Sequence, residues 1–179
     1  MKQIQLLPIG SLESFVLDDL RSKLCEHWQI PCAVLPARLD PEFALHPERQ
    51  QYHSTEILAR LQNFLRPDTW RLLGVASVDL YIPILTFVFG EAQVGNACAV
   101  VSTYRLRQEF YGLPAGPELL RERLLKEAMH ELGHTLELAH CEDYRCAMAP
   151  SHAVEWIDLK GRALCPDCRT RILAARTGS

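Results

Sequence analysis

Three histidines and one glutamate lie close together in the second half of the chain. His130 and His134 are four residues apart, Glu131 directly follows the first, and His140 comes six residues after the second. On a helix, residues four apart share one face, about 40° apart around the axis and roughly 6 Å along it, so one tetrahedral zinc ion can bridge both imidazoles. Glu131 projects about 100° away, where its carboxylate can hydrogen-bond a zinc-bound water instead of binding the metal.

With His140 as a third ligand, this pattern predicts a catalytic zinc site. Three neutral imidazoles leave the fourth zinc position open to water, whose pKa the metal lowers towards ~7. Glu131 could then take a proton during attack on a peptide carbonyl and deliver it to the leaving amine. A chance match on an exposed helix is the alternative, and His152 is a further candidate ligand.

Four of the seven cysteines gather near the C-terminus with spacing typical of zinc ligands: Cys141, Cys146, Cys165 and Cys168. Four thiolates form a closed tetrahedral site with no position for water, so the predicted role is structural. Two disulfides or buried reduced thiols are the alternatives, and a reducing compartment would disfavour disulfides. The sequence therefore predicts two zinc ions per chain, one catalytic and one structural.

Length and composition indicate an ordinary globular protein. The chain has 179 residues, 48% apolar and 23% charged, with a net charge of −3, which suits one domain and gives no basic field for a nucleic-acid partner. No apolar run approaches the ~20 residues that cross a bilayer, and the apolar stretch at the N-terminus is too short and interrupted for a signal peptide. We therefore expect a cytoplasmic protein without membrane contact.

Hydrophobic periodicity predicts a mixed sheet with backing helices. Strands are expected over residues 3–9, 32–35, 71–80, 82–89 and 97–104, the last two as a hairpin with Gly90, Gly95 and Asn96 as its turn residues. Helices are expected from Val16 to Trp28, from an N-cap at Ser54 to Leu65, and from Pro117 onward along an apolar stripe that ends at Leu136. His130 and His134 lie off that stripe, as an active-site helix packed on a sheet requires. The segment from 143 to 160 reads as irregular.

Together these motifs resemble those of the archaemetzincin family of metzincin-type zinc metallopeptidases. The matching residues are His130-Glu131-x-x-His134, His140-Cys141, Cys146-Ala147-Met148 and Cys165-Pro166-Asp167-Cys168. The likeness is strong over the second half of the chain, whereas the N-terminal part matches only in layout.

The resemblance implies an α+β, zincin-like fold in one domain of residues 1–179. Its N-terminal subdomain, 1–140, would hold the sheet and the active-site helix, and a small irregular part, 141–179, would hold a Met-turn and the four-cysteine zinc. Met148 would then pack beneath the catalytic zinc without binding it. The implied function is that of a monomeric metallopeptidase acting on a peptide or protein substrate.

One residue departs from the family pattern. Glu137 stands where the family has a glycine, which ends the helix with a positive φ and lets the third histidine return to the metal. We expect the turn to persist with His140 bound, because a left-handed non-glycine residue costs on the order of 1 kcal/mol and zinc binding is worth on the order of 10 kcal/mol. If the helix instead continued, Glu137 would project near His130, and a catalytically weak or silent zinc protein of the same fold would be the alternative function.

Overall fold

A five-stranded sheet forms the centre of the molecule in the computed structural model, which describes the backbone of residues 1–177 and the side chains of residues 1–173. Its strand order is β2 (Cys32–Val34), β1 (Gln3–Ile9), β5 (Thr69–Ala76), β8 (Cys98–Ser102) and β7 (Gly90–Ala92). The first four strands are parallel, and β7 is antiparallel to β8 at the edge. A small second sheet has the order β3 (Leu45–His46), β4 (Gln51–His53) and β6 (Leu80–Tyr81).

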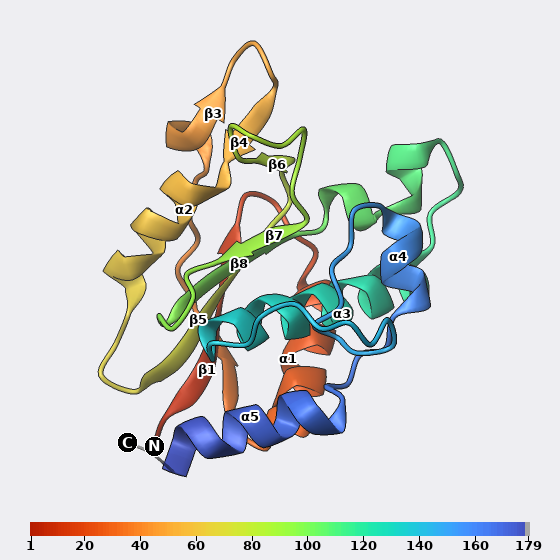
Figure 1. The fold of residues 1–179 in the computed structure, drawn as a ribbon. Coiled ribbons are helices and arrows are strands. Elements are labelled where there is room, and N and C mark those ends of the chain that lie inside the picture. Colours follow the sequence, from red (N-terminus) through yellow and green to blue (C-terminus); the bar gives the residue numbers. More distant parts are fainter. Residues whose placement is uncertain (178–179) are drawn as a thin grey trace.

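Helices cover both faces of the main sheet (Figure 1). Because side chains alternate along a strand, Leu6 and Leu73 pack against α1 (Ser14–Trp28) and α3 (Pro117–Thr135), whereas Leu7 and Leu72 pack on the other face against α2 (Ser54–Leu61). Short 3₁₀ turns occupy Glu42–Ala44, Gln62–Phe64, Tyr104–Leu106 and Gln108–Tyr111. Thus α3 packs against both the sheet and α1, and its C-terminal half is almost entirely buried.

The C-terminal part contains more regular structure than expected. It has two helices, α4 (Val154–Leu159) and α5 (Pro166–Thr177), and α4 falls within the segment 143–160 that was expected to be irregular. Ile157, Leu164 and Ile172 from this part join the same core as α1 and α3. The expectation of an irregular segment is therefore wrong in detail, because a few well-spaced apolar residues suffice when they dock on an existing core.

Residues 82–89 do not form the expected strand. They make a loop between β6 and β7, with Ile84 86% exposed. The hairpin partner of β8 is the shorter β7, which begins at Gly90, so the predicted turn glycine is a strand residue. Ser54 is also not an N-cap: His53 takes that position, and the Ser54 hydroxyl donates to the Tyr81 carbonyl and to Glu91.

Among the described residues, no helix is both long and apolar enough to cross a membrane.

Candidate active site and metal centres

The turn after α3 determines where the third histidine lies. The helix ends at Thr135, and Glu137 has a φ of 65°, in the left-handed region. The Leu138 amide donates to the Gly133 carbonyl at 3.1 Å, which satisfies a carbonyl of the last helical turn. The chain therefore leaves the helix axis at the point where the family has glycine, and the continued helix does not occur.

This turn brings the three histidines together. Their ring nitrogens lie within 4.8 Å of one another, and the Nε2 atoms of His130 and His134 are 3.1 Å apart. A tetrahedral zinc ion with bonds of about 2.0–2.1 Å separates its ligand nitrogens by roughly 3.3 Å. The spacing of the imidazoles therefore fits a zinc ion.

The protonation of the histidine rings also fits a zinc site. Nδ1 of His130 lies 2.9 Å from the Ala147 carbonyl, and Nδ1 of His134 lies 2.7 Å from the Leu138 carbonyl. Because a carbonyl oxygen only accepts, each Nδ1 carries the proton and each Nε2 is free for a metal. Burial, assisted by the nearby Lys160 cation, lowers the pKa of His130 to about 2, so this ring is neutral, as a ligand must be.

Glu131 lies in the same cleft as the histidines. The cleft has a volume of about 520 Å³, and its lining includes the three histidines, Glu131 and residues of the loop and strand from 85 to 92. Burial, with the charge of Glu127 second, raises the pKa of Glu131 well above its ordinary value. A carboxyl group with a raised pKa suits proton transfer near neutral pH.

Gly90 leaves space for the side chain of Glu131. A Cβ on Gly90 would lie 2.7 Å from Cγ and 2.8 Å from Oε1 of Glu131, and 2.6 Å from the Val100 carbonyl oxygen. The edge strand therefore approaches the active-site helix as closely as only glycine permits. The sequence pattern identified this glycine as a turn residue and missed its role here.

Met148 has no exposed surface, and its sulfur faces Gly133 of α3. A Cβ on Gly133 would collide with its sulfur, so the glycine of the histidine motif makes room for this methionine. The neighbouring Ala147 carbonyl is the one that accepts from His130, which places the segment 146–149 directly against the candidate zinc ligands.

The four C-terminal cysteines form a second cluster, with all sulfur atoms within 4.8 Å of one another. Cys141 and Cys165 have a sulfur–sulfur distance of 3.8 Å, which equals the roughly 3.8 Å expected for thiolates on one tetrahedral zinc and far exceeds the about 2.0 Å of a disulfide. The amides of Met148 and Cys165 point at the Cys146 sulfur, at 3.4 and 3.3 Å. The cluster therefore fits a closed structural zinc site.

Two further charged residues near the site were not found from the sequence. Lys160 and Glu127 form an ion pair of 2.8 Å with side chains 1% and 4% exposed. Lys160 also donates to the Ala149 carbonyl at 3.1 Å and lies 3.5 Å from Nδ1 of His130. Glu127 lies one helical turn before Glu131, so helical spacing could have indicated that it lies near the site. Lys160 lies in a segment without clear periodicity, so no local pattern indicated its position. His152 lies on the cleft wall, outside the three-histidine group.

Comparisons with known proteins decide the family. The model of peptidase family M54 matches residues 29–174. The chain belongs to this peptidase family.

Similar proteins named archaemetzincins cover almost the whole chain. The archaemetzincin of Methanocaldococcus jannaschii is 40% identical, over 95% of this chain and 92% of the relative. That of Thermococcus kodakarensis is 36% identical, over 97% of this chain and 96% of the relative. The chain is a zinc metallopeptidase, and the resemblance to archaemetzincins is confirmed.

Solved structures of similar proteins show the same α+β fold. The archaemetzincin of Archaeoglobus fulgidus, crystallised with malonate, superimposes with a TM-score of 0.82 at 37% identity, over 94% of this chain and 99% of that one. A zinc-dependent peptidase of Methanocorpusculum labreanum gives a TM-score of 0.87 at 27% identity, with the same coverage. The expected fold class is therefore correct.

Proposed function

We propose that this metallopeptidase hydrolyses peptide bonds in peptide or protein substrates at the cleft beside α3, with Glu131 as general base and then general acid. His130, His134 and His140 would hold the catalytic zinc, with Met148 packed beneath it, and the four cysteines would hold a structural zinc. The observation that carries this proposal is the convergence of two free Nε2 atoms and the Glu131 carboxylate on one cleft.

Bound zinc supplies a Lewis acid that lowers the pKa of water and polarises a carbonyl group. The residues of the chain supply the rest. Glu131 accepts a proton from the attacking water and returns it to the leaving amine, and its raised pKa favours the second of these steps. The carbonyls of Ala147 and Leu138 keep the His130 and His134 rings in the orientation that directs Nε2 into the cleft.

The edge strand β7 offers a binding mode for the substrate. Phe89 and Gln93 direct backbone groups to β8, since Phe89 accepts from Ser102 and Gln93 donates to Cys98. In an antiparallel ladder, alternate residues point to opposite sides. Gly90 and Ala92 therefore turn their backbone groups away from β8, and both line the cleft, where an extended peptide can add as a further strand.

The proposal includes the wider setting of the enzyme. We expect one domain over residues 1–179, with a subdomain boundary between 140 and 141, acting as a monomer without a nucleic-acid partner. No disulfide joins any of the seven cysteines, all of which lie within the described residues, and this favours a reducing compartment such as the cytoplasm.

Hydrolysis across a peptide library tests the proposed function. The zinc-loaded wild type should cleave a subset of peptides, and Glu131→Ala should lose at least about 100-fold in kcat, because general acid–base catalysis contributes that much or more. Zinc content should stay the same in the variant, which shows that the metal site is intact. Equal turnover by both proteins would refute the role of Glu131, and a wild type that cleaves no peptide would favour the silent zinc protein.

A further inference from the structure

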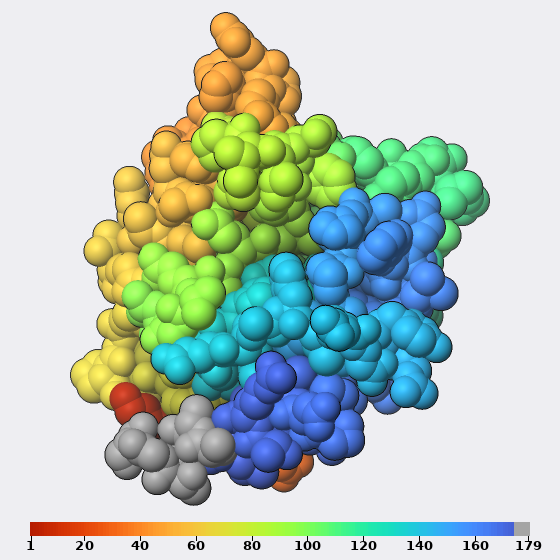
Figure 2. All heavy atoms as spheres, viewed as in Figure 1, coloured from red at the N-terminus to blue at the C-terminus, as the bar shows by residue number. Residues whose placement is uncertain are grey.

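The loop of residues 82–89, here called the rim loop, forms the wall of the cleft opposite the histidines. Leu85, Phe87 and Phe89 are among its cleft-lining residues, and Leu85 is 49% exposed. Figure 2 shows the yellow-green atoms of this region above the cyan atoms of the C-terminal half of α3. A peptide lying along β7 would pass beneath this wall, so the position of the loop affects how the peptide fits.

The rim loop has little regular backbone pairing to hold it in place. At its end, the Val88 amide donates to the Leu80 carbonyl and the Phe89 carbonyl accepts from the Ser102 amide. Before that, the Leu85 amide donates to the Ile82 carbonyl in a turn. The carbonyls of Leu85 and Thr86 lie outside any strand, so other donors must satisfy them. The side chains that supply these donors also hold the loop over the cleft.

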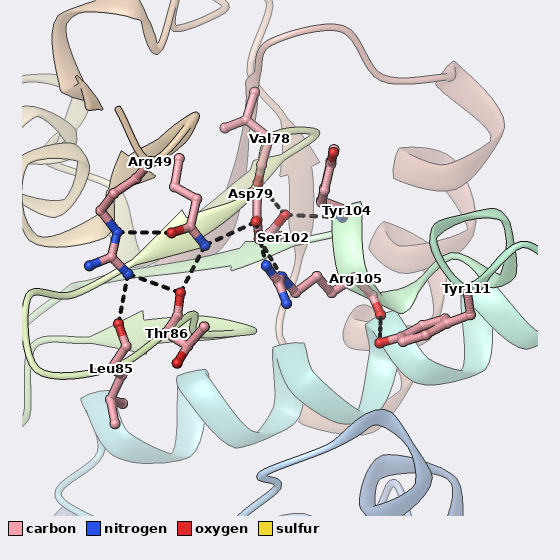
Figure 3. A network of polar contacts seen from close by, with 10 residues as sticks. Arg49, Val78, Asp79, Leu85, Thr86, Ser102, Tyr104, Arg105 and Tyr111 are labelled. Atoms are coloured by element: carbon pink, nitrogen blue, oxygen red, sulfur yellow. Dashed lines mark hydrogen bonds and ion pairs between the residues drawn. The ribbon is translucent and has the colours of Figure 1, made fainter. Parts of the chain in front are cut away.

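Arg49 supplies most of these donors. Its Nη2 donates to the carbonyls of Leu85 at 2.8 Å and Thr86 at 3.0 Å (Figure 3). Its guanidinium also stacks over the Tyr81 ring, with 4.1 Å to the centroid. A planar guanidinium can serve two acceptors and one ring face at once, which an ammonium group cannot do as well. Arg49 thus joins the chain before β4 to the middle of the rim loop.

A second arginine holds the other side of the loop. Arg105 lies over the Phe87 ring with 4.2 Å to the centroid, and its Nε and Nη2 both donate to Asp79 at 2.7 Å. Bidentate pairing of this kind fixes the orientation of the guanidinium. Phe87 is therefore held between the network and the cleft.

Gln51 links the two arginines through groups that are nearly buried. It accepts from Nε of Arg49 at 2.9 Å, and its amide donates to Asp79 at 3.0 Å and to the Thr86 carbonyl at 2.9 Å. Gln51 is 7% and Asp79 8% exposed. Hydrogen bonds away from water are stronger, so this network holds the rim loop more firmly than an exposed set of contacts would.

We propose that Arg49 is a positioning residue for substrate, which holds the rim loop so that its apolar side chains contact large apolar side chains of the bound peptide. This inference rests on the proposed peptidase function and deepens it by naming a substrate class. The Arg49 side chain bonds to Gln51 and the rim loop and stacks on Tyr81. Since none of these is a candidate zinc ligand or the acid–base group, its effect should fall on binding more than on chemistry.

Peptide binding to an inactive background tests the inference separately from turnover. Two fluorescein-labelled peptides, one rich in leucine and one with serine at the same positions, are titrated by anisotropy into zinc-loaded Glu131→Ala. Adding Arg49→Ala should raise the Kd of the leucine peptide at least threefold and change that of the serine peptide less. Leu85→Ser, which leaves Arg49 in place, should weaken the leucine peptide to a similar extent.

Arg60→Ala is the matched control, because it removes the same charge from a guanidinium that stacks on Phe43 away from the cleft. It should leave both Kd values within twofold. In the active enzyme, most of the loss in kcat/KM of Arg49→Ala should appear as a higher KM. An unchanged Kd for Arg49→Ala, or an equal loss with Arg60→Ala, would overturn the inference. A wild type without turnover would instead refute the proposed function, since the binding comparison does not depend on cleavage.

Discussion

Three backbone positions control the geometry of the active site at the scale of single residues. Gly90 allows β7 to approach Glu131, Gly133 leaves space for Met148, and Glu137 turns the chain with a positive φ. None of the three is a metal ligand. Each acts through the space or the backbone angle that it provides. Substitutions at these positions therefore change the geometry of the site while leaving the candidate zinc ligands and Glu131 in the sequence.

Replacing Glu137 tests whether the departure from the family pattern restrains the enzyme. Glu137→Gly should raise the free energy of unfolding by up to about 1 kcal/mol, because glycine tolerates the left-handed region, with part of the gain offset by its greater freedom when unfolded. The Glu137 side chain is exposed and lies over Gly95, apart from the histidines. We therefore expect kcat/KM to change by less than about threefold, a difference well below 1 kcal/mol.

Glu137→Ala is the control for this comparison, since it removes the carboxylate and keeps a Cβ in the same backbone conformation. Urea unfolding and steady-state kinetics on the zinc-loaded proteins provide the measurements. A gain in activity of more than about tenfold in Glu137→Gly would show that Glu137 suppresses turnover and would contradict this expectation.

Replacing Gly90 by alanine should displace Glu131. The added methyl group would lie under 3 Å from both the Glu131 side chain and the Val100 carbonyl. We expect kcat to fall at least about tenfold, because a misplaced acid–base group loses part of its contribution, and stability to fall by about 1–3 kcal/mol through overpacking. Kinetics at saturating substrate and thermal unfolding measure the two effects. Unchanged kcat with a lower stability would show that Glu131 need not lie where the structure has it.

The contact between α3 and the segment 146–149 is the main one at the scale of elements. Gly133 and Met148 meet directly, the Ala147 carbonyl accepts from His130, and the Cys141 amide donates to the Met148 carbonyl at 2.9 Å. One short segment thus contacts the active-site helix, a candidate zinc ligand and the start of the cysteine cluster. Packing against α3 therefore helps to fix the position of the segment 146–149, in addition to any bound zinc.

A double-mutant cycle measures this packing. Gly133→Ala should cost about 1–3 kcal/mol through the clash with the Met148 sulfur, and Met148→Ala about 2–5 kcal/mol through the cavity that it leaves. The double variant should be more stable than the sum of the two losses implies, because the shorter side chain at 148 removes the clash. Urea unfolding of the zinc-loaded proteins gives the three values. Strict additivity would show that the two residues do not compete for the same space.

The sequence predicted those elements whose own pattern determines them. The strand over residues 3–9, the helix to Trp28 and the helix from Pro117 all occur, because each has an apolar face that matches its period. The turn at Glu137 also follows from local reasoning, since the cost of a positive φ is small beside the free energy of metal binding.

Other features depend on partners distant in the sequence and could not be predicted. The apolar run of residues 82–89 looked like a strand, but the side chains of Arg49 and Gln51 bind the carbonyls of Leu85 and Thr86 in its middle, where a neighbouring strand would otherwise pair. Ser54 pairs with Glu91 instead of capping its helix. The ion pair of Lys160 with Glu127 needs α4 to dock on α3, which no local pattern reveals.

The two candidate zinc centres connect the halves of the chain at the scale of the whole molecule. His140 and Cys141 are adjacent, so one peptide unit joins the three-histidine group to the four-cysteine group. The C-terminal segment also shares the core of α1 and α3. Loss of the structural zinc should therefore increase the mobility of both the segment 146–149 and His140. Activity should fall although Glu131 itself is unchanged.

Zinc content per chain, measured by mass spectrometry on folded protein and site variants, tests the central claim of two separate zinc centres most directly. The zinc-loaded wild type should contain two zinc ions, and His130→Ala with His134→Ala should contain one, because only the four-cysteine site remains complete. Cys165→Ser with Cys168→Ser should lose the structural ion and most of the peptidase activity. A wild type that saturates at one zinc ion, or a double histidine variant that still holds two, would contradict the account.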